Sequence, residues 1–430
     1  MIFKNITLID ENFDVQKGMN VVVKNGKIVR VCRELPQDVG NSDEIYDGHN
    51  KLLMPGFVNA HAHTPMTLLR GYSENKTLQD WLFKDIFPFE DKMTPHDVYN
   101  GMMLGIAEML RFGVVSTSDM YFSCDKMCEA AIETGTKFNI SNGMTCFDDG
   151  DFKDNNAFKE TQIMLRDYHG ANGGAVLADA SVHAEYTSNP RIVGQVLEYA
   201  KENELNMHLH LSETKTEHEE CVKRHGKTPA KYFSDIGIFE LSTTAAHCVW
   251  VTAKDIDILK RAGVTVASNP ISNLKLASGV CPAGALLRTG VNVAIGTDGM
   301  ASNNNINILE DVKMFSLIHK GVNYDPLLIT PKEAFRAATV NGFRAQGRGD
   351  CGLIKEGYKA DLIVVDLDKP YYYPSHNILN DLLYSGVGTD VCLTMVDGKV
   401  LYRDEKYTTL DIEKVVYNAS NSVKQILARL

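Results

Sequence analysis

The chain has 430 residues, of which 44% are hydrophobic, and a formal net charge of −11. It is too long for one minimal domain and suits a barrel of about 250 residues with a smaller module. The acidic balance and the absence of a basic run argue against nucleic acid and anionic membranes as partners.

The sequence predicts a cytoplasmic protein with reduced cysteines. Its first residues lack the basic start and apolar core of a signal peptide, and no window approaches the roughly 18 apolar residues of a membrane span. The nine cysteines are scattered without a Cys-x-x-Cys. Cys124 and Cys128 stand four apart, as on one helix face, and no second pair lies nearby to make a zinc finger. The sequence leaves open whether the protein forms a homo-oligomer.

Short strands are predicted at both ends of the chain. Asn25-Gly26 and Asp397-Gly398 are hairpin signals within these two groups. The first group has too few apolar residues for a core of its own, so both ends are predicted to join in one small β-sandwich of residues 1–54 and 355–410. The predicted strands are Ile2–Ile9, Met19–Val23, Lys27–Val31, Ala360–Asp366, Val391–Val396 and Lys399–Tyr402.

Residues 55–354 alternate apolar strands with helical patterns such as Pro95–Phe112, Pro190–Asn203, Lys254–Ala262 and Pro282–Thr289. Eight such units favour an α/β fold of the distorted (β/α)₈ type, a TIM barrel, over the alternative of an open parallel sheet. Asp411–Leu430 is predicted as a terminal helix on the surface. The strand candidates are Gly56–His61, Val114–Met120, Phe138–Met144, Val176–His183, Asn206–Leu211, Thr244–Val249, Val264–Ser268 and Val291–Gly296.

Histidines and acids gather at the carboxyl ends of these strands, where catalytic residues of such barrels stand. Three imidazoles and one carboxylate suit a catalytic zinc or iron(II) ion that keeps a position for water. His208 and His210 face the same side of their strand, so residue alternation does not decide which one ligates. The residues concerned are His61, His63, His208, His210, Glu213, His247 and Asp298.

Two acids are placed to move protons beside such a metal. Glu213 follows His210 by three residues and can lean over the barrel mouth without binding the ion. Asp298 can both touch the metal and accept the proton of its water. Because Asp298 precedes Gly299, an ordinary loop carboxylate or helix N-cap is the alternative.

Together these motifs resemble the amidohydrolase superfamily, in its metal-dependent deaminase and chlorohydrolase branch. They are most similar to the 5′-methylthioadenosine/S-adenosylhomocysteine deaminases, and the split β-sandwich fits the same family. Each motif is weak alone, but their order along most of the chain is specific. The motifs are Pro55–His63, Leu68–Gly71, His210–Thr214, Ala246–Cys248, Ser272–Leu276 and Gly296–Asn304.

The resemblance implies one divalent metal ion, zinc with iron as the alternative, held by His61, His63, His210 and Asp298. It selects His210 as the ligand and places His208 lower in the barrel. The run Ala178–Glu185 on the fourth strand contains no lysine that could bridge two metals, which also favours a single ion.

The resemblance further assigns Glu213, His247 and Asp298 to catalysis. His247 is expected to hydrogen-bond the water or the tetrahedral centre, and Glu213 to protonate N1 of a purine while hydroxide adds to the adjacent carbon. The implied reaction is hydrolytic deamination of an adenine nucleoside to the inosine analogue and ammonia. The alternatives are an aminohydrolase or chlorohydrolase of guanine, pterin, cytosine or triazine, and a barrel that binds metal or ligand without turnover.

Substrate contacts follow from the same resemblance. Trp81 is expected as a pocket wall, Glu90 as the acid that holds ribose hydroxyls, and His183 against the heterocycle, with Glu213 and Ser302 beside them. The alternative for Trp81 is packing of a lid helix, and for His183 an ordinary strand-end histidine.

The sequence departs from relatives that accept a homocysteine arm. Asn142 stands where they carry arginine, and the stretch Asp148–Asp154 after it is acidic. An acidic loop is a poor clamp for a substrate carboxylate, although Lys153 offers one cation. A neutral 5′ substituent or plain adenosine is therefore favoured over S-adenosylhomocysteine. Ser268-Asn269-Pro270 also lacks a histidine of some relatives, which leaves the ring specificity open.

Overall fold

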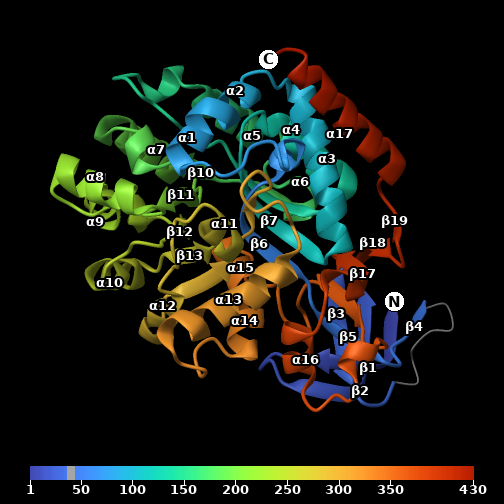
Figure 1. Ribbon diagram of the computed structural model, residues 1–430. Coiled ribbons are helices and arrows are strands. Elements are labelled where there is room, and N and C mark those ends of the chain that lie inside the picture. The colour runs from blue at the N-terminus through green and yellow to red at the C-terminus, as the bar shows by residue number, and fades with distance from the viewer. Residues whose placement is uncertain (36–43) are drawn as a thin grey trace.

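The chain is described from a computed structural model that places residues 1–35 and 44–430; residues 36–43, within the predicted segment 1–54, lie outside the described residues. Two parallel sheets form the centre and together close the predicted barrel (Figure 1). Their pairing orders are β15-β6-β7-β8-β9 and β10-β11-β12-β13-β14. The strands are β6 (Phe57–His63), β7 (Val114–Met120), β8 (Lys137–Ser141), β9 (Val176–Ala178), β10 (Ala180–Val182), β11 (Met207–Leu211), β12 (Thr243–His247), β13 (Thr265–Ser268), β14 (Asn292–Ile295) and β15 (Asp298–Gly299).

The fourth predicted strand is divided between the two sheets at Asp179. The backbone N–H of Asp179 donates to the carbonyl of Ile140 in β8, whereas that of Ala180 donates to Asn206 beside β11. The Asp179 carboxylate is buried and accepts hydrogen bonds from Asn139 Nδ2 and Asn206 Nδ2. The chain therefore passes from one sheet to the other with the buried Asp179 carboxylate hydrogen-bonded.

The eighth predicted strand closes the barrel in two pieces. The N–H of Gly296, after β14, donates to Ser268 in β13, and two residues further Asp298 of β15 pairs with Ala62 of β6. A Cβ at Gly296 would lie 2.8 Å from the backbone N and O of His61. Only glycine permits this approach, which brings Asp298 beside the first strand.

Helices cover the outside of the barrel, and the predicted helices are all present with ends shifted by one to three residues (Figure 1). The terminal helix α17 packs on α3, where Asn100 Nδ2 donates to Ser422 Oγ at 3.0 Å. The helices are α1 (Leu78–Trp81), α2 (Phe87–Glu90), α3 (Pro95–Arg111), α4 (Cys124–Thr134), α5 (Asn156–Asp167), α6 (Ala171–Gly174), α7 (Pro190–Glu202), α8 (Lys215–His225), α9 (Pro229–Ile236), α10 (Ala253–Ala262), α11 (Pro270–Lys275), α12 (Ala283–Thr289), α13 (Ile308–Asn323), α14 (Pro331–Ala337), α15 (Val340–Ala345), α16 (Ile378–Tyr384) and α17 (Ile412–Leu427). No helix of the described ranges combines the length and the apolar character needed to cross a membrane.

Both chain ends join in a third, nine-stranded sheet, as predicted, because β16 pairs antiparallel with β5. Asn25-Gly26 and Asp397-Gly398 form the two predicted hairpin turns. Among the described residues the sheet runs β19-β18-β17-β16-β5-β1-β2-β3, with β4 beside β1. We keep the boundaries 1–54, 55–354, 355–410 and 411–430 as our proposal for the domains. The strands are β1 (Ile2–Ile9), β2 (Val15–Lys24), β3 (Lys27–Cys32), β4 (Ile45–Asp47), β5 (Lys51–Pro55), β16 (Leu362–Asp366), β17 (Val391–Val396), β18 (Lys399–Arg403) and β19 (Lys406–Tyr407).

A buried ion cluster joins this sheet to the barrel. Lys137 of β8 has no exposed surface and donates to Asp361 Oδ1 at 2.6 Å and to Asp397 Oδ1 at 2.7 Å. Both acids flank strands of the nine-stranded sheet. The cluster therefore couples the amino-terminal end of the barrel to the chain termini.

We expect Asp361→Ala to lower the free energy of unfolding by about 3 kcal/mol or more, because it leaves the buried Lys137 ammonium with one partner fewer. Glu240→Ala, which removes an exposed ion pair with Lys201, is the matched control and should cost about 0.5 kcal/mol or less. Urea unfolding measures both. Equal costs for the two variants would contradict this role of the cluster.

Candidate metal-dependent active site

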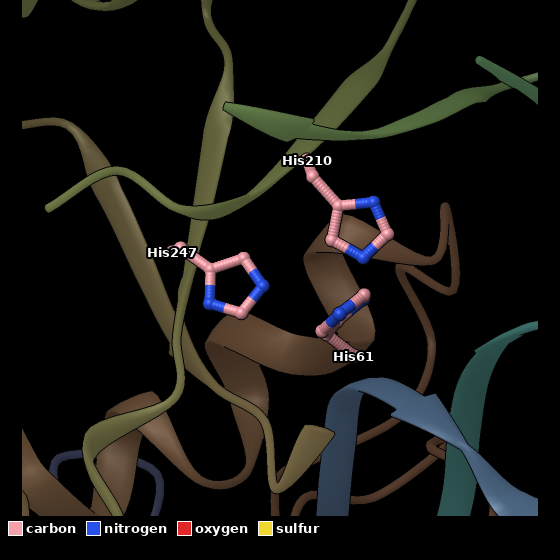
Figure 2. A group of neighbouring side chains, drawn as sticks. All are labelled: His61, His210 and His247. Carbon is pink, nitrogen blue, oxygen red and sulfur yellow. The ribbon is translucent and has the colours of Figure 1, made fainter. Parts of the chain in front are cut away.

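Three histidine rings from separate strands turn toward one point at the carboxyl end of the barrel (Figure 2). His61 belongs to β6, His210 to β11 and His247 to β12. Their nearest ring nitrogens lie within 4.8 Å of one another, and so do the ligand atoms of His61, His63 and Asp298. The structure thus brings together all four residues predicted as metal ligands, with His247 beside them.

The Nε2 atoms of His63 and His210 face each other, because the Nδ1 atoms of both rings are hydrogen-bonded to the backbone. His63 Nδ1 donates to the carbonyl of Met120, and His210 Nδ1 donates to the carbonyl of His183 at 2.7 Å. A carbonyl only accepts, so both Nε2 atoms are left facing the site, 3.4 Å apart. Two lone pairs at this distance repel unless a positive charge lies next to them.

The charges around this point favour a cation. Burial lowers the pKa of His61 to about 3, so its ring is neutral. Burial also lowers the pKa of His63, but Asp298, 3.3 Å away, outweighs it and raises that pKa to about 9. For Asp298, burial raises the pKa, and the neighbouring His61 and His63 rings reverse this and hold it well below its usual range. An ionised carboxylate therefore stands beside the neutral His61 ring, and it favours a positive charge next to it, on the His63 ring or on a bound cation.

One buried atom tests whether a metal fits. His61 Nε2 has no hydrogen-bond partner among the described residues, and the His61 side chain is fully buried. Such an orphaned polar atom is costly unless something binds it. A divalent ion coordinated by His61, His63, His210 and Asp298 would satisfy it, so the residues present fit a metal site of the kind predicted.

His208 lies behind the predicted metal ligands and not among them. Its Nε2 contacts His61 Nδ1 at 3.0 Å, where it orients the His61 ring from below. This placement agrees with the prediction that His208 stands lower in the barrel. Ser272 supports Asp298 in a similar way, since its hydroxyl donates to Asp298 Oδ2 at 2.5 Å.

His247 is held by two amides and faces Glu213. Its Nδ1 lies 2.8 Å from Asn273 Oδ1 and 3.2 Å from Asn269 Nδ2, and its Nε2 lies 3.8 Å from Glu213 Oε2. Burial raises the pKa of Glu213, which favours a protonated acid at this place. Ser278 donates to Glu213 Oε1 at 3.3 Å and fixes the carboxyl group further.

A cavity of about 330 Å³ opens from the metal ligands. This volume is within the range of small-molecule sites. All residues predicted to bind substrate line it, namely Trp81, Glu90, His183, Glu213 and Ser302. The Ser302 hydroxyl is already engaged, because it donates to Asp298 Oδ2 at 3.2 Å. His183 Nδ1 likewise contacts Thr187 Oγ1 at 3.0 Å.

Glu90 is presented to the cavity by a partner that the sequence prediction missed. Tyr121 follows β7 and donates its hydroxyl to Glu90 Oε1 at 2.6 Å. Burial raises the pKa of Glu90 to about 7. Tyr186, Asn155 and Asn156 also line the cavity without having been predicted. Tyr121 could have been found, since it directly follows a predicted strand. Asn155 and Asn156 stand at the start of α5 and Tyr186 in a short 3-10 helix, and no strand-end pattern marks them.

The barrel and its convergent ligand set define a metal-dependent hydrolase, and comparisons with known proteins agree. A family model described as the amidohydrolase family matches residues 52–401, and the chain therefore belongs to the amidohydrolase family. A curated protein of Dictyoglomus thermophilum named 5-methylthioadenosine/S-adenosylhomocysteine deaminase is 42% identical over 387 residues, which is 90% of each chain. A 5′-deoxyadenosine deaminase of Methanosarcina mazei is 37% identical, covering 100% of this chain and 99% of the relative.

Solved structures extend the likeness to three dimensions. An adenosine deaminase from Xanthomonas campestris with bound zinc superposes with a TM-score of 0.92 at 31% identity, covering 99% of this chain and 98% of that one. The shared fold confirms the predicted barrel with a sheet domain.

We expect His208→Phe to weaken zinc binding by about 10- to 100-fold, because the His61 ring loses the partner that orients it. Competition with a chromophoric chelator measures the affinity. His96→Phe, at an exposed position on α3, is the control and should bind zinc as the parent does. Equal affinities for the two variants would show that His208 does not support the site.

Proposed function

We propose that this protein is a hydrolytic deaminase of adenine nucleosides with an uncharged 5′ end, and that it uses one zinc ion. The observation that carries this proposal is the set of residues that meet at a single cavity. The cavity is lined by three of the four proposed metal ligands (His63, His210 and Asp298), by the buried acid Glu213 beside His247, and by a second acid, Glu90, held by Tyr121. Glu213 is suited to protonate the ring that reacts, and Glu90 is suited to accept hydrogen bonds from a pair of sugar hydroxyls.

Each residue has a distinct task in the proposed reaction. His61, His63, His210 and Asp298 would hold a zinc ion, which would make hydroxide available by lowering the pKa of bound water. Asp298 Oδ1 takes up the proton that the water loses. Glu213, whose pKa is raised by burial, delivers a proton to the ring nitrogen next to the carbon under attack. His247 Nε2 hydrogen-bonds the oxygen that adds to the ring. Asp298 passes its proton to the amino group, which leaves as ammonia, and the added hydroxyl returns a proton to Glu213 as it becomes the carbonyl.

The relatives support both the reaction and the metal. Two carry names of adenine nucleoside deaminases, and the zinc-containing neighbour is named an adenosine deaminase. Zinc is our choice over iron because the ligands are imidazoles and a carboxylate, which zinc accepts readily. We also place the protein in the cytoplasm, where the nine thiols, all free in the structure, would stay reduced.

The uncharged 5′ end follows from the cavity wall. No lysine or arginine is among the described residues that line the cavity, and Lys153 is exposed outside it. Asn142, which replaces the arginine of some relatives, lines the wall instead. A substrate carboxylate would therefore be desolvated without a cation to meet it.

The direct test is to incubate the zinc-loaded protein with adenosine, 5′-methylthioadenosine and S-adenosylhomocysteine and to follow the loss of adenine absorbance and the release of ammonia. We expect turnover of the first two and poor turnover of the third. No change with any adenine nucleoside would refute the proposed function.

We expect Glu213→Gln to lower kcat by about a thousandfold or more while zinc content stays at one ion per chain, because Gln cannot deliver a proton. Elemental analysis of the purified variant checks the metal. Glu129→Gln, on the outer helix α4, is the control and should retain activity. Turnover by Glu213→Gln at the parent rate would remove this residue from the mechanism.

We expect Glu90→Gln to lower kcat/KM for adenosine by about tenfold or more, because hydrogen bonds from the sugar to a carboxylate are the stronger kind. With 2′,3′-dideoxyadenosine, which lacks both hydroxyls, parent and variant should perform alike. Steady-state kinetics on the two substrates measures the difference. An equal loss on both substrates would show that Glu90 supports the fold and does not hold the sugar.

A further inference from the structure

A hydrogen-bonded cluster around Glu160 forms one wall of the cavity and has no part in the chemistry described so far. Glu160 Oε1 accepts from Ser123 N at 3.1 Å and Asn156 Nδ2 at 2.8 Å. Glu160 Oε2 accepts from Cys124 N at 3.1 Å and Asn142 Nδ2 at 2.8 Å. The two backbone donors belong to the start of α4, where a helix favours negative charge.

The cluster fixes the orientation of two amides that line the cavity. A carboxylate only accepts hydrogen bonds, so the Nδ2 atoms of Asn142 and Asn156 must face Glu160. Their Oδ1 atoms are then turned away from it. Neither Oδ1 accepts a hydrogen bond from any residue in the described ranges, and both side chains line the cavity. This part of the wall therefore offers acceptors to a ligand.

A third asparagine at the same place, Asn155, has no free amide group to offer a ligand. Asn155 Oδ1 accepts from Ala157 N at 2.9 Å, and Asn155 Nδ2 donates to the carbonyl of Thr145 at 2.8 Å. Both polar groups of its amide are thus used within the protein. The contrast makes Asn155 a natural control for Asn142 and Asn156.

The acceptor wall adjoins the proposed sugar site. Ser123, which Glu160 binds, lies two residues beyond Tyr121, whose hydroxyl holds Glu90. With the base at Glu213 and the sugar diol at Glu90, the 5′ carbon is the part of a nucleoside left to face this wall. Acceptors favour a donor at that carbon, and only a hydroxyl among the common neutral substituents can donate.

Resting on the proposed function, we propose that Asn142 and Asn156, oriented by Glu160, select nucleosides with a 5′-hydroxyl. Adenosine is then the preferred substrate. A 5′-deoxy or 5′-methylthio group leaves both acceptors without a partner, and a carboxylate on a longer arm meets oxygen atoms of like partial charge. Glu160 is a positioning residue in this device, and the two asparagines touch the substrate.

The test compares kcat/KM for adenosine and 5′-deoxyadenosine, which differ only in the 5′ oxygen. The parent should prefer adenosine by about fivefold or more, the effect of one hydrogen bond. Asn156→Ala, at an exposed position, should reduce that ratio, and Glu160→Gln should bring it toward one. Gln presents an NH₂ group to one asparagine, which must then turn its own NH₂ to the cavity.

Asn155→Ser keeps a helix N-cap for α5 and should leave the ratio unchanged. If Glu160→Gln does not fold, Asn156→Ala decides. A parent ratio near one, or a ratio that neither variant alters, overturns the proposal while deamination of both nucleosides upholds the proposed function. If no adenine nucleoside is deaminated, the proposed function fails, and this inference fails with it.

Discussion

The site depends on one electrostatic constraint: imidazole lone pairs and a carboxylate oxygen face a common point that only a positive charge can occupy. The hydrogen bonds of His63 and His210 to backbone carbonyls commit their Nδ1 protons elsewhere. The buried His61 Nε2 has no other partner within the described chain. Folding therefore brings together groups that fit a cation, and the surrounding shell keeps the rings from turning away.

Barrel closure supplies the last member of this set. Asp298 reaches His63 because the chain crosses over β6 at Gly296, where no side chain would fit. His247 and Asp298 both adopt left-handed backbone conformations, with φ of 70° and 64°. Such conformations cost of order 1 kcal/mol each and persist only where the surrounding structure holds them. Local strain at the strand ends is thus offset by the stability of the barrel.

Chemistry and selectivity come from different parts of the fold. The ends of β6, β11, β12 and β15 hold the groups that act on water and on the ring, and they are tied into a rigid sheet. The walls come from α1, α2 and α5 and from the segments after β7 and β8, and they carry Trp81, Glu90 and the asparagines. Substitutions in these walls can change what the cavity accepts without disturbing the proposed metal ligands.

The sequence by itself determined the alternation of strands and helices, the union of both chain ends in one sheet, and the residue types of a metal site. Those features are local: hydrophobic period, hairpin turns and His-x-His at a strand end. It could not decide between His208 and His210, whose side chains share a face, nor find Tyr121 as the partner of Glu90 or Glu160 as the anchor of two amides. Only the tertiary structure decided these, because each depends on which atoms of distant segments meet, and a sequence pattern has no record of such distances.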